Sequence, residues 1–156
     1  MNELTGAWAM LTWTSRGAAG EVSHPFGEKP QGILVYTADD TMCSSFMRAG
    51  REPLGVSLEA LAAARRYWMG LDGAAAPPDG ALRERLMQAV LHFNSYGGRY
   101  RVEGDRVHHH VEVALFPDWV GQRLTRSWRL DGDRLTLSFA TGGRSDSLEW
   151  RRLRRD

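Results

Sequence analysis

Three consecutive histidines are the side chains of this sequence best suited to proton transfer or metal binding. They lie in an alternating segment, residues 107–121, that reads VHHHVEVALFPDWVG. Side chains on a β-strand point alternately to opposite faces. One face then carries Val107, His109, Val111, Val113 and Leu115, and the other carries His108, His110, Glu112, Ala114 and Phe116. We expect the first face, which is apolar except for one histidine, to line the interior of a β-barrel.

His109 is therefore the first candidate for a catalytic residue. A neutral imidazole in an apolar lumen can donate or accept a hydrogen bond, and burial lowers its tendency to be charged. Such a group could polarise a carbonyl or shuttle a proton. The alternative is a structural histidine that bonds a side chain of a neighbouring strand, since buried polar groups normally have a partner.

Arg126 is the second catalytic candidate, because it shares strand parity with Leu124 and Trp128. A guanidinium in an apolar barrel needs a carboxylate, a cluster of carbonyl groups or an anionic ligand. We expect Arg126 to lie at the barrel mouth and to face an oxygen of the ligand. The alternative is a partly solvated position in which its aliphatic stem only covers apolar surface.

The same parity predicts a set of apolar and aromatic residues around the ligand. Aromatic side chains with a polar end suit a pocket that is apolar in bulk and specific at one point. Core packing is the competing interpretation, and a hollow barrel lets one residue do both. The predicted ligand-binding residues are Tyr36, Phe46, Tyr100, Val111, Val113 and Trp128.

A metal site on the opposite face of the histidine strand is the rival hypothesis. His108, His110 and Glu112 lie at i, i+2 and i+4, so two imidazoles and a carboxylate could converge on a metal. No later histidine supplies another ligand, so we interpret these residues as a solvated outer face and predict no metal or other cofactor. The sequence also lacks a G-x-S-x-G elbow, a P-loop, a dinucleotide fingerprint and a C-x-x-C pair.

Short alternating segments separated by turn residues predict a mainly β fold, an up-and-down antiparallel barrel of about eight strands. Helical spacing replaces the alternation at about residues 56–96, with Ser57 and Asp79 as N-caps of two inserted helices. Hairpin turns are expected around Gly104 and Gly132. The predicted strands are 5–13, 33–37, 41–48, 98–103, 107–116, 121–130, 134–139 and 147–153.

Length and composition restrict the class of protein. A chain of 156 residues suits a single domain, residues 1–156, with a full hydrophobic core. The net charge is +1, and the arginine-rich residues 151–155 lack the aromatic pattern of a nucleic-acid site. The one cysteine excludes an internal disulfide, and no signal peptide or transmembrane run is seen. We predict a cytoplasmic protein without nucleic-acid or membrane partners.

Several motifs in fixed order resemble the bacterial and fungal lipocalin-like domain family. They are PFG at residues 25–27, GILVYTAD at 32–39, YGGRY at 96–100, HHVEV at 109–113, PDWVG at 117–121, DGDRLTL at 131–137 and WRR at 150–152. Gly6-Ala7-Trp8 has the G-x-W spacing of lipocalins, whose tryptophan closes the barrel base under a late arginine. The resemblance implies a lipocalin-like β-barrel with a helical insertion.

The resemblance implies less about activity, because one fold hosts many functions. Some similar barrels act as cyclases or isomerases in natural-product pathways. Leu124 stands where the family usually has a glutamine, and Asp40 and Thr41 replace a glycine and an aromatic residue. These departures favour a ligand that differs from those of relatives.

We predict that the barrel binds a hydrophobic, oxygenated small molecule and acts as a cofactor-independent isomerase or cyclase of a polyketide-like intermediate. His109 and Arg126 would polarise a carbonyl or move a proton, and preorganised donors would supply the rate. A non-catalytic binding or carrier protein with the same cavity is the alternative. A metal-dependent enzyme that uses His108, His110 and Glu112 is a weaker alternative.

Overall fold

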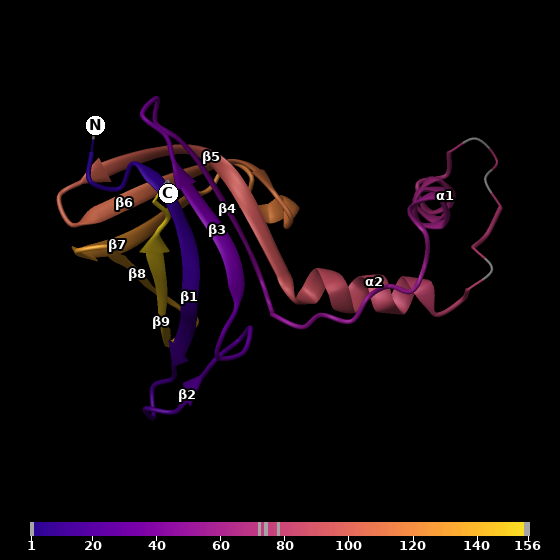
Figure 1. The fold of residues 1–156 in the computed structure, drawn as a ribbon, viewed down its shortest axis with the longest axis horizontal. Helices are drawn as coiled ribbons and strands as arrows, with labels where there is room; N and C mark the ends of the chain where they lie inside the picture. Colours follow the sequence, from indigo (N-terminus) through magenta and orange to yellow (C-terminus); the bar gives the residue numbers. More distant parts are fainter. Residues whose placement is uncertain (1, 72, 74, 78, 155–156) are drawn as a thin grey trace. The chain divides into compact units, whose positions relative to one another are not determined.

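The computed structural model describes residues 2–71, 73, 75–77 and 79–154. The chain divides into two compact units, one formed by Met1–Ala49 with Phe93–Asp156 and the other by Gly50–His92. Among the described residues, the first unit holds the strands and the second holds the α-helices (Figure 1).

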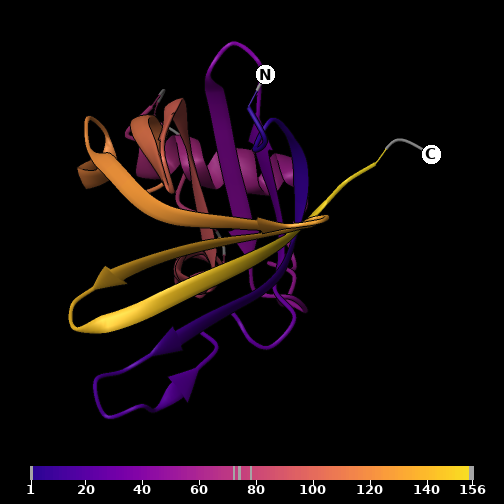
Figure 2. The ribbon, with the colours of Figure 1, turned by 90° about the vertical axis from the view of Figure 1, so that its left-hand side faces the viewer.

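The strands of the first unit form a closed antiparallel β-barrel (Figure 1; Figure 2). The described residues form a nine-stranded sheet in the order β2-β1-β3-β4-β5-β6-β7-β8-β9, in which β1 also pairs with β9. Apart from the short β2, consecutive strands are neighbours, so the prediction of an up-and-down barrel is confirmed. The strands are β1 (Gly6–Arg16), β2 (Val22–Ser23), β3 (Gln31–Tyr36), β4 (Thr41–Met47), β5 (Phe93–Glu103), β6 (Arg106–Ala114), β7 (Arg123–Asp131), β8 (Arg134–Thr141) and β9 (Arg144–Arg152).

Glycine turns close the two predicted hairpins. Gly104 joins β5 to β6 with a φ of 59°, and Gly132 joins β7 to β8 with a φ of 56°. Residues other than glycine rarely adopt this left-handed conformation. The residues beside each turn pair directly, as Glu103 and Arg106 do, so each turn fixes the register of its hairpin.

Trp8 of β1 is buried beneath an arginine of β9, as the resemblance to lipocalins implies. The Trp8 side chain is 0% exposed, and its Nε1 donates to the Leu4 carbonyl at 2.9 Å. The Arg152 guanidinium carbon lies 4.0 Å from the centroid of the Trp8 ring. Arg152 also donates to the carbonyls of Thr5 and Glu3 at 2.8 and 2.7 Å. These contacts tie the first strand of the barrel to the last.

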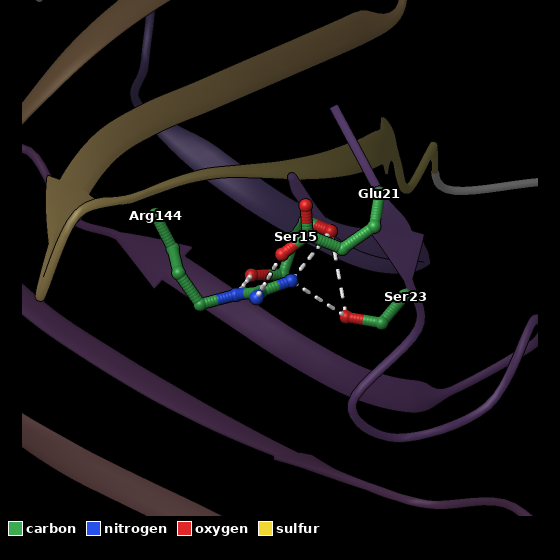
Figure 3. A network of polar contacts seen from close by, with 4 residues as sticks. All are labelled: Ser15, Glu21, Ser23 and Arg144. Atoms are coloured by element: carbon green, nitrogen blue, oxygen red, sulfur yellow. Dashed lines mark hydrogen bonds and ion pairs between the residues drawn. The ribbon is translucent and has the colours of Figure 1, made fainter. Parts of the chain in front are cut away.

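The short strand β2 is held against β1 by the side chain of Arg144 from β9 (Figure 3). The ladder between β1 and β2 is two residue pairs long. The Arg144 guanidinium donates to Ser15 Oγ at 2.9 Å and to Ser23 Oγ at 3.1 Å. It also forms an ion pair with Glu21 Oε1 at 3.1 Å. One side chain therefore joins three segments of the sheet.

A bulge at Glu112 reverses the direction of the side chains that follow it in β6. Gly97 pairs with Val113 and Gly98 pairs with Val111, so Glu112 is the extra residue opposite β5. Val111 is 3% exposed, whereas Val113 is 66% exposed. The prediction that Val113 faces the barrel interior is therefore wrong, because strand parity does not continue across a bulge.

The second unit contains α1 (Leu58–Trp68) and α2 (Leu82–Leu91). Ser57 caps α1 as predicted, since its Oγ accepts a hydrogen bond from the Ala60 amide at 3.1 Å. Asp79 accepts from the amide of Ala81, which is itself the N-cap of α2, at 2.9 Å. The first barrel strand after the helices, β5, begins at Phe93. Residues 93–96, which the prediction of an insertion at 56–96 included, therefore belong to a strand. None of the described helices is long and apolar enough to cross a membrane.

Candidate functional site

A chain of hydrogen bonds runs through the buried side chains of Tyr36, His109 and Tyr96. The Tyr36 hydroxyl lies 2.7 Å from His109 Nε2, and the Tyr96 hydroxyl lies 3.0 Å from His109 Nδ1. His109 is 0% exposed, Tyr36 is 1% exposed and Tyr96 is 7% exposed. Tyr36 lies on β3, His109 on β6 and Tyr96 on β5. His109 thus faces the barrel interior, and both of its ring nitrogens have a phenol partner.

The register of β5 and β6 places this chain on the interior face. Tyr96, Gly98 and Tyr100 alternate along β5, and Tyr100 pairs directly with His109. A Cβ atom on Gly98 would lie 2.1 Å from the carbonyl oxygen of His110. Gly98 therefore allows the backbone of β6 to approach β5 closely beside the chain.

Burial disfavours the charged form of all three groups. Desolvation, followed by the positive charge of Arg126, lowers the pKa of His109 from 6.5 to about 3. Desolvation also raises the pKa of Tyr36 well above its ordinary value and raises that of Tyr96. The charge of Arg126 opposes the rise at both tyrosines. At neutral pH the chain therefore consists of a neutral imidazole between two neutral phenols.

Counting donors and acceptors gives this neutral chain a direction. A neutral imidazole has one N–H donor and one acceptor nitrogen. A proton on Nε2 would make Tyr36 an acceptor, and its own buried hydroxyl proton would then lack an acceptor among the described residues. With the proton on Nδ1, Tyr36 donates to Nε2 and His109 donates to Tyr96. The Tyr96 hydroxyl can then donate onward, to its cross-strand neighbour Ser44 or to a ligand.

Arg126 lies where the barrel interior meets the surface. Its Nη1 donates to the carbonyl of Thr125 at 3.1 Å, and its guanidinium carbon lies 3.9 Å from the centroid of the Phe139 ring. The side chain is half-buried and lines a cavity of about 360 Å³ between β7 and β8. The charge of Arg126 acts on His109 and on both tyrosines of the chain. The structure therefore brings the two predicted catalytic residues into one region.

Tyr100, a predicted ligand-binding residue, has its hydroxyl occupied by protein groups. The hydroxyl donates to the Thr37 carbonyl at 2.9 Å and accepts from Asn2 Nδ2 at 3.0 Å. The ring is 3% exposed and its centroid lies 4.6 Å from that of Tyr36. Tyr100 thus supports Tyr36 from the side, and its polar end already has a donor and an acceptor.

The other predicted ligand-binding residues differ in their surroundings. Phe46 is 4% exposed, and its ring lies 5.8 Å from that of Trp13 and 6.1 Å from that of Trp150. Val111 is buried in the same hydrophobic core. Trp128 is half-buried, and its Nε1 donates to a backbone carbonyl in the turn between β5 and β6 at 3.1 Å. Of this set, only Val113 points away from the interior.

The residues of the rival metal hypothesis do not converge. His108 Nδ1 lies 2.9 Å from Thr125 Oγ1, and His108 Nε2 lies 3.4 Å from Glu103 Oε2. His108 is 6% exposed, so its predicted solvated position is wrong, whereas His110 and Glu112 are exposed as expected. Over the part of the chain that the structure describes, no group of three His, Cys, Asp or Glu side chains is placed to hold a metal ion.

Tyr96 is the member of the chain that the sequence-based prediction missed. The predicted strand begins at Gly98, whereas β5 begins at Phe93. Extending the parity of Tyr100 backwards through Gly98 reaches Tyr96, so the alternation itself contained the signal. The helical spacing assigned to residues 56–96 concealed it.

The closed meander and its largely apolar interior define a small barrel of the lipocalin type, a fold that can hold a small ligand. The model of the lipocalin-like domain family matches residues 5–152, and the chain belongs to this family.

The chain is similar to a named carrier protein and to two proteins of solved structure. The chain is 34% identical over 86 residues to the 4'-hydroxy-3'-methoxypropiophenone carrier protein ppsC of Aspergillus oryzae. The matched region covers 46% of this chain and 78% of that protein. The fold of the present chain is similar to that of an uncharacterized protein from Bacteroides eggerthii, with a TM-score of 0.44 and 9% identity. The match covers 97% of this chain and 100% of that protein. A variant of the fluorescent protein UnaG gives a TM-score of 0.40, 10% identity and coverage of 96% of both chains.

Proposed function

We propose that the barrel binds a hydrophobic small molecule with an oxygen function, and that the Tyr96 hydroxyl donates a hydrogen bond to that oxygen. The observation that supports this proposal is the buried chain from Tyr36 through His109 to Tyr96. The chain fixes the position of the Tyr96 hydroxyl oxygen before a ligand arrives. A preorganised donor in an apolar site costs little further ordering when the ligand binds.

The specific reaction that we propose is a cofactor-independent isomerisation or cyclisation of a carbonyl compound. The Tyr96 hydroxyl would polarise the carbonyl, and the nearby Arg126 charge would stabilise negative charge that develops on its oxygen. Full proton transfer along the chain would leave Tyr36 as a buried phenolate, which the raised pKa of Tyr36 opposes. In this proposal the chain acts through hydrogen bonding, and His109, whose pKa is lowered to about 3 by burial, stays neutral and holds the Tyr96 hydroxyl.

Carriage without reaction is the second candidate function. The named relative from Aspergillus oryzae is a carrier protein for an aryl ketone, a hydrophobic molecule with an oxygen function. A donor that is neutral and fixed also suits a protein that only holds such a ketone. The two candidate functions share one binding site and differ in whether the bound molecule changes.

Binding is tested with 4'-hydroxy-3'-methoxypropiophenone as the probe, by titration calorimetry. The Tyr96→Phe variant should bind this ketone about tenfold more weakly, the equivalent of one lost hydrogen bond of about 1.4 kcal/mol. The Tyr67→Phe variant is the matched control, since Tyr67 is exposed on α1 in the other unit. Equal affinity of Tyr96→Phe and the unchanged protein would contradict the proposed anchor.

The test of catalysis begins with denaturation of the purified protein, and mass spectrometry identifies any small molecule that is released. Incubation of this molecule or its precursor with fresh protein should give an isomer that is resolved by chromatography and NMR. Loss of that product in Tyr96→Phe but not in Tyr67→Phe would support the reaction. Tight binding with an unchanged NMR spectrum would favour the carrier function.

A further inference from the structure

The strands β7 and β8 separate on one side of the barrel. Their pairing runs from the turn at Asp131 and Arg134 to Ser127 and Ser138. β7 extends beyond this point to Arg123, and β8 extends to Thr141, but no further residues of these two strands pair with each other. We call this region the β7–β8 opening. Its cavity of about 360 Å³ is lined by Arg106, Arg123, Leu124, Thr125, Arg126, Ser127, Ser138, Phe139 and Ala140.

The β7–β8 opening is strongly cationic. Arg106, Arg123 and Arg126 line it, and its lining contains no aspartate or glutamate. None of the ion pairs found among the described residues involves these three arginines. Arginine remains protonated at any physiological pH. Three like charges therefore share one cavity without a protein carboxylate to neutralise them.

Arg126 connects this cavity to the barrel interior. It shares a face of β7 with Leu124, which pairs with the buried His109. Its guanidinium spans the opening, because it donates to Thr125 on β7 and stacks over Phe139 on β8. Its charge is also felt at the buried histidine and tyrosines. A molecule in the opening would thus meet charge outside and apolar side chains further in.

We propose that the β7–β8 opening binds the carboxylate, or an equivalent oxyanion, of an amphipathic small molecule whose apolar part lies in the barrel. This inference rests on the proposed function and adds the charge of the ligand. Planar guanidinium groups bind carboxylates through two parallel hydrogen bonds. The hydroxyl groups of Ser127 and Ser138 in the lining are further donors to such an anion.

A pair of probes that differ only in charge tests this site. Dodecanoate carries a carboxylate, and dodecanol has the same chain without the charge. The unchanged protein should bind dodecanoate at least about tenfold more tightly than dodecanol in low salt. This preference should shrink as ionic strength rises, because arginines at an open cavity are screened by salt.

Variants of the lining arginines locate the effect. Arg126→Gln, and separately the exposed pair Arg106→Gln with Arg123→Gln, should remove most of the preference for dodecanoate. The exposed pair, which has no part in the proposed contact with the ligand oxygen, should leave dodecanol affinity unchanged. Arg129→Gln is the matched control, because Arg129 is an exposed residue of β7 that does not line the cavity. Thermal unfolding of each variant verifies that it is folded. If Arg126→Gln does not fold, the variant with Arg106→Gln and Arg123→Gln still tests the site.

The outcomes separate this inference from the proposed function. Equal affinity of the unchanged protein for both probes would overturn the anion site and leave the hydrophobic binding function intact. Failure to bind either probe would count against both. Loss of the preference in Arg129→Gln to the same extent as in the lining variants would show a general surface charge effect, which also overturns the site.

Discussion

His109 sits in the interior of the barrel as a neutral base whose surroundings resist its protonation. The unfolded chain exposes the same imidazole to water, where its ordinary pKa of 6.5 applies. The folded and unfolded states therefore bind protons differently between pH 6.5 and about 3. This difference makes the protonation of His109 measurable through the stability of the protein.

The first prediction concerns stability against pH. Because the unfolded state binds the proton more tightly, the free energy of unfolding should fall as the pH drops below 6.5, by at most about 1.4 kcal/mol per pH unit. Urea unfolding between pH 7 and about 4.5, where most carboxylates stay ionised, measures this slope. His109→Gln should lose most of the slope. An equal slope in both proteins would mean that other groups cause it.

The second prediction concerns the tautomer of His109. The donor count places the imidazole proton on Nδ1, since Tyr36 has only Nε2 as its partner among the described residues. Nitrogen-15 NMR distinguishes a protonated ring nitrogen from an acceptor nitrogen. We expect Nδ1 to carry the proton at neutral pH. A proton on Nε2 would reverse the chain and make Tyr36, instead of Tyr96, the hydroxyl that needs a further acceptor.

At the level of strands, the close approach of β5 and β6 depends on one residue without a side chain. A Cβ on Gly98 would lie 2.1 Å from the His110 carbonyl oxygen and 2.8 Å from the Glu112 amide nitrogen. Both are backbone atoms, so relief requires one strand to move. The same shift would disturb the bulge at Glu112 and the position of His109 near it.

The third prediction follows from this contact. Gly98→Ala should lower the free energy of unfolding by about 3 kcal/mol or more, since overpacking in a tight core typically costs about 1–3 kcal/mol. Gly104→Ala, in a turn with no atom within 4 Å of the new Cβ, should cost only about 1 kcal/mol through its left-handed backbone. Denaturant unfolding compares the two. Equal losses would show that contact with β6 is not the cause.

The fourth prediction concerns the attachment of β2. Arg144→Gln removes the contacts to Ser15, Glu21 and Ser23, so residues 17–23 should exchange amide hydrogens faster and be cleaved sooner by protease. The global loss should stay near about 1 kcal/mol, because the side chain is partly exposed. Arg134→Gln, which breaks an exposed ion pair with Glu149, is the control. It should leave residues 17–23 unchanged.

At the scale of the molecule, β1 and β9 close the barrel, and Arg152 reinforces that closure. The fifth prediction is that Arg152→Gln lowers the free energy of unfolding by about 2 kcal/mol, through lost hydrogen bonds to Thr5 and Glu3 and lost contact with Trp8. Thermal unfolding measures the loss. Arg151→Gln, an exposed neighbour, is the control. Equal stability of the two variants would show that ladder pairing alone closes the barrel.

The barrel could be predicted from the sequence because its signals are local. Alternation marked the strands, and glycine turns such as that at Gly104 marked the hairpins. The bulge at Glu112 could not be predicted in this way, since it arises from pairing with Gly97 and Gly98 on another strand. That one extra residue turned Val113 outward.

The candidate site was predicted only in part, because local alternation gives the direction of a side chain but not its partners on other strands. Parity correctly turned His109 inward, but its partners come from β3 and β5, and no local pattern pairs Tyr36 with Tyr96 through an imidazole. His108 shows the opposite failure. Its outward face is covered by Thr125 and Glu103 from neighbouring segments, so outward direction did not mean exposure.

The pairing of β1 with β9 has a consequence for how the protein is made. The ribosome synthesises β1 early and β9 late. The barrel can therefore close, and Trp8 can pair with Arg152, only after β9 has been made. Contacts between residues so far apart in sequence fold slowly, typically over milliseconds to seconds in all-β domains. During that time the nascent chain presents an unpaired strand edge, which is a template for association with other chains. We expect the newly synthesised chain to depend on chaperones more than the finished barrel does.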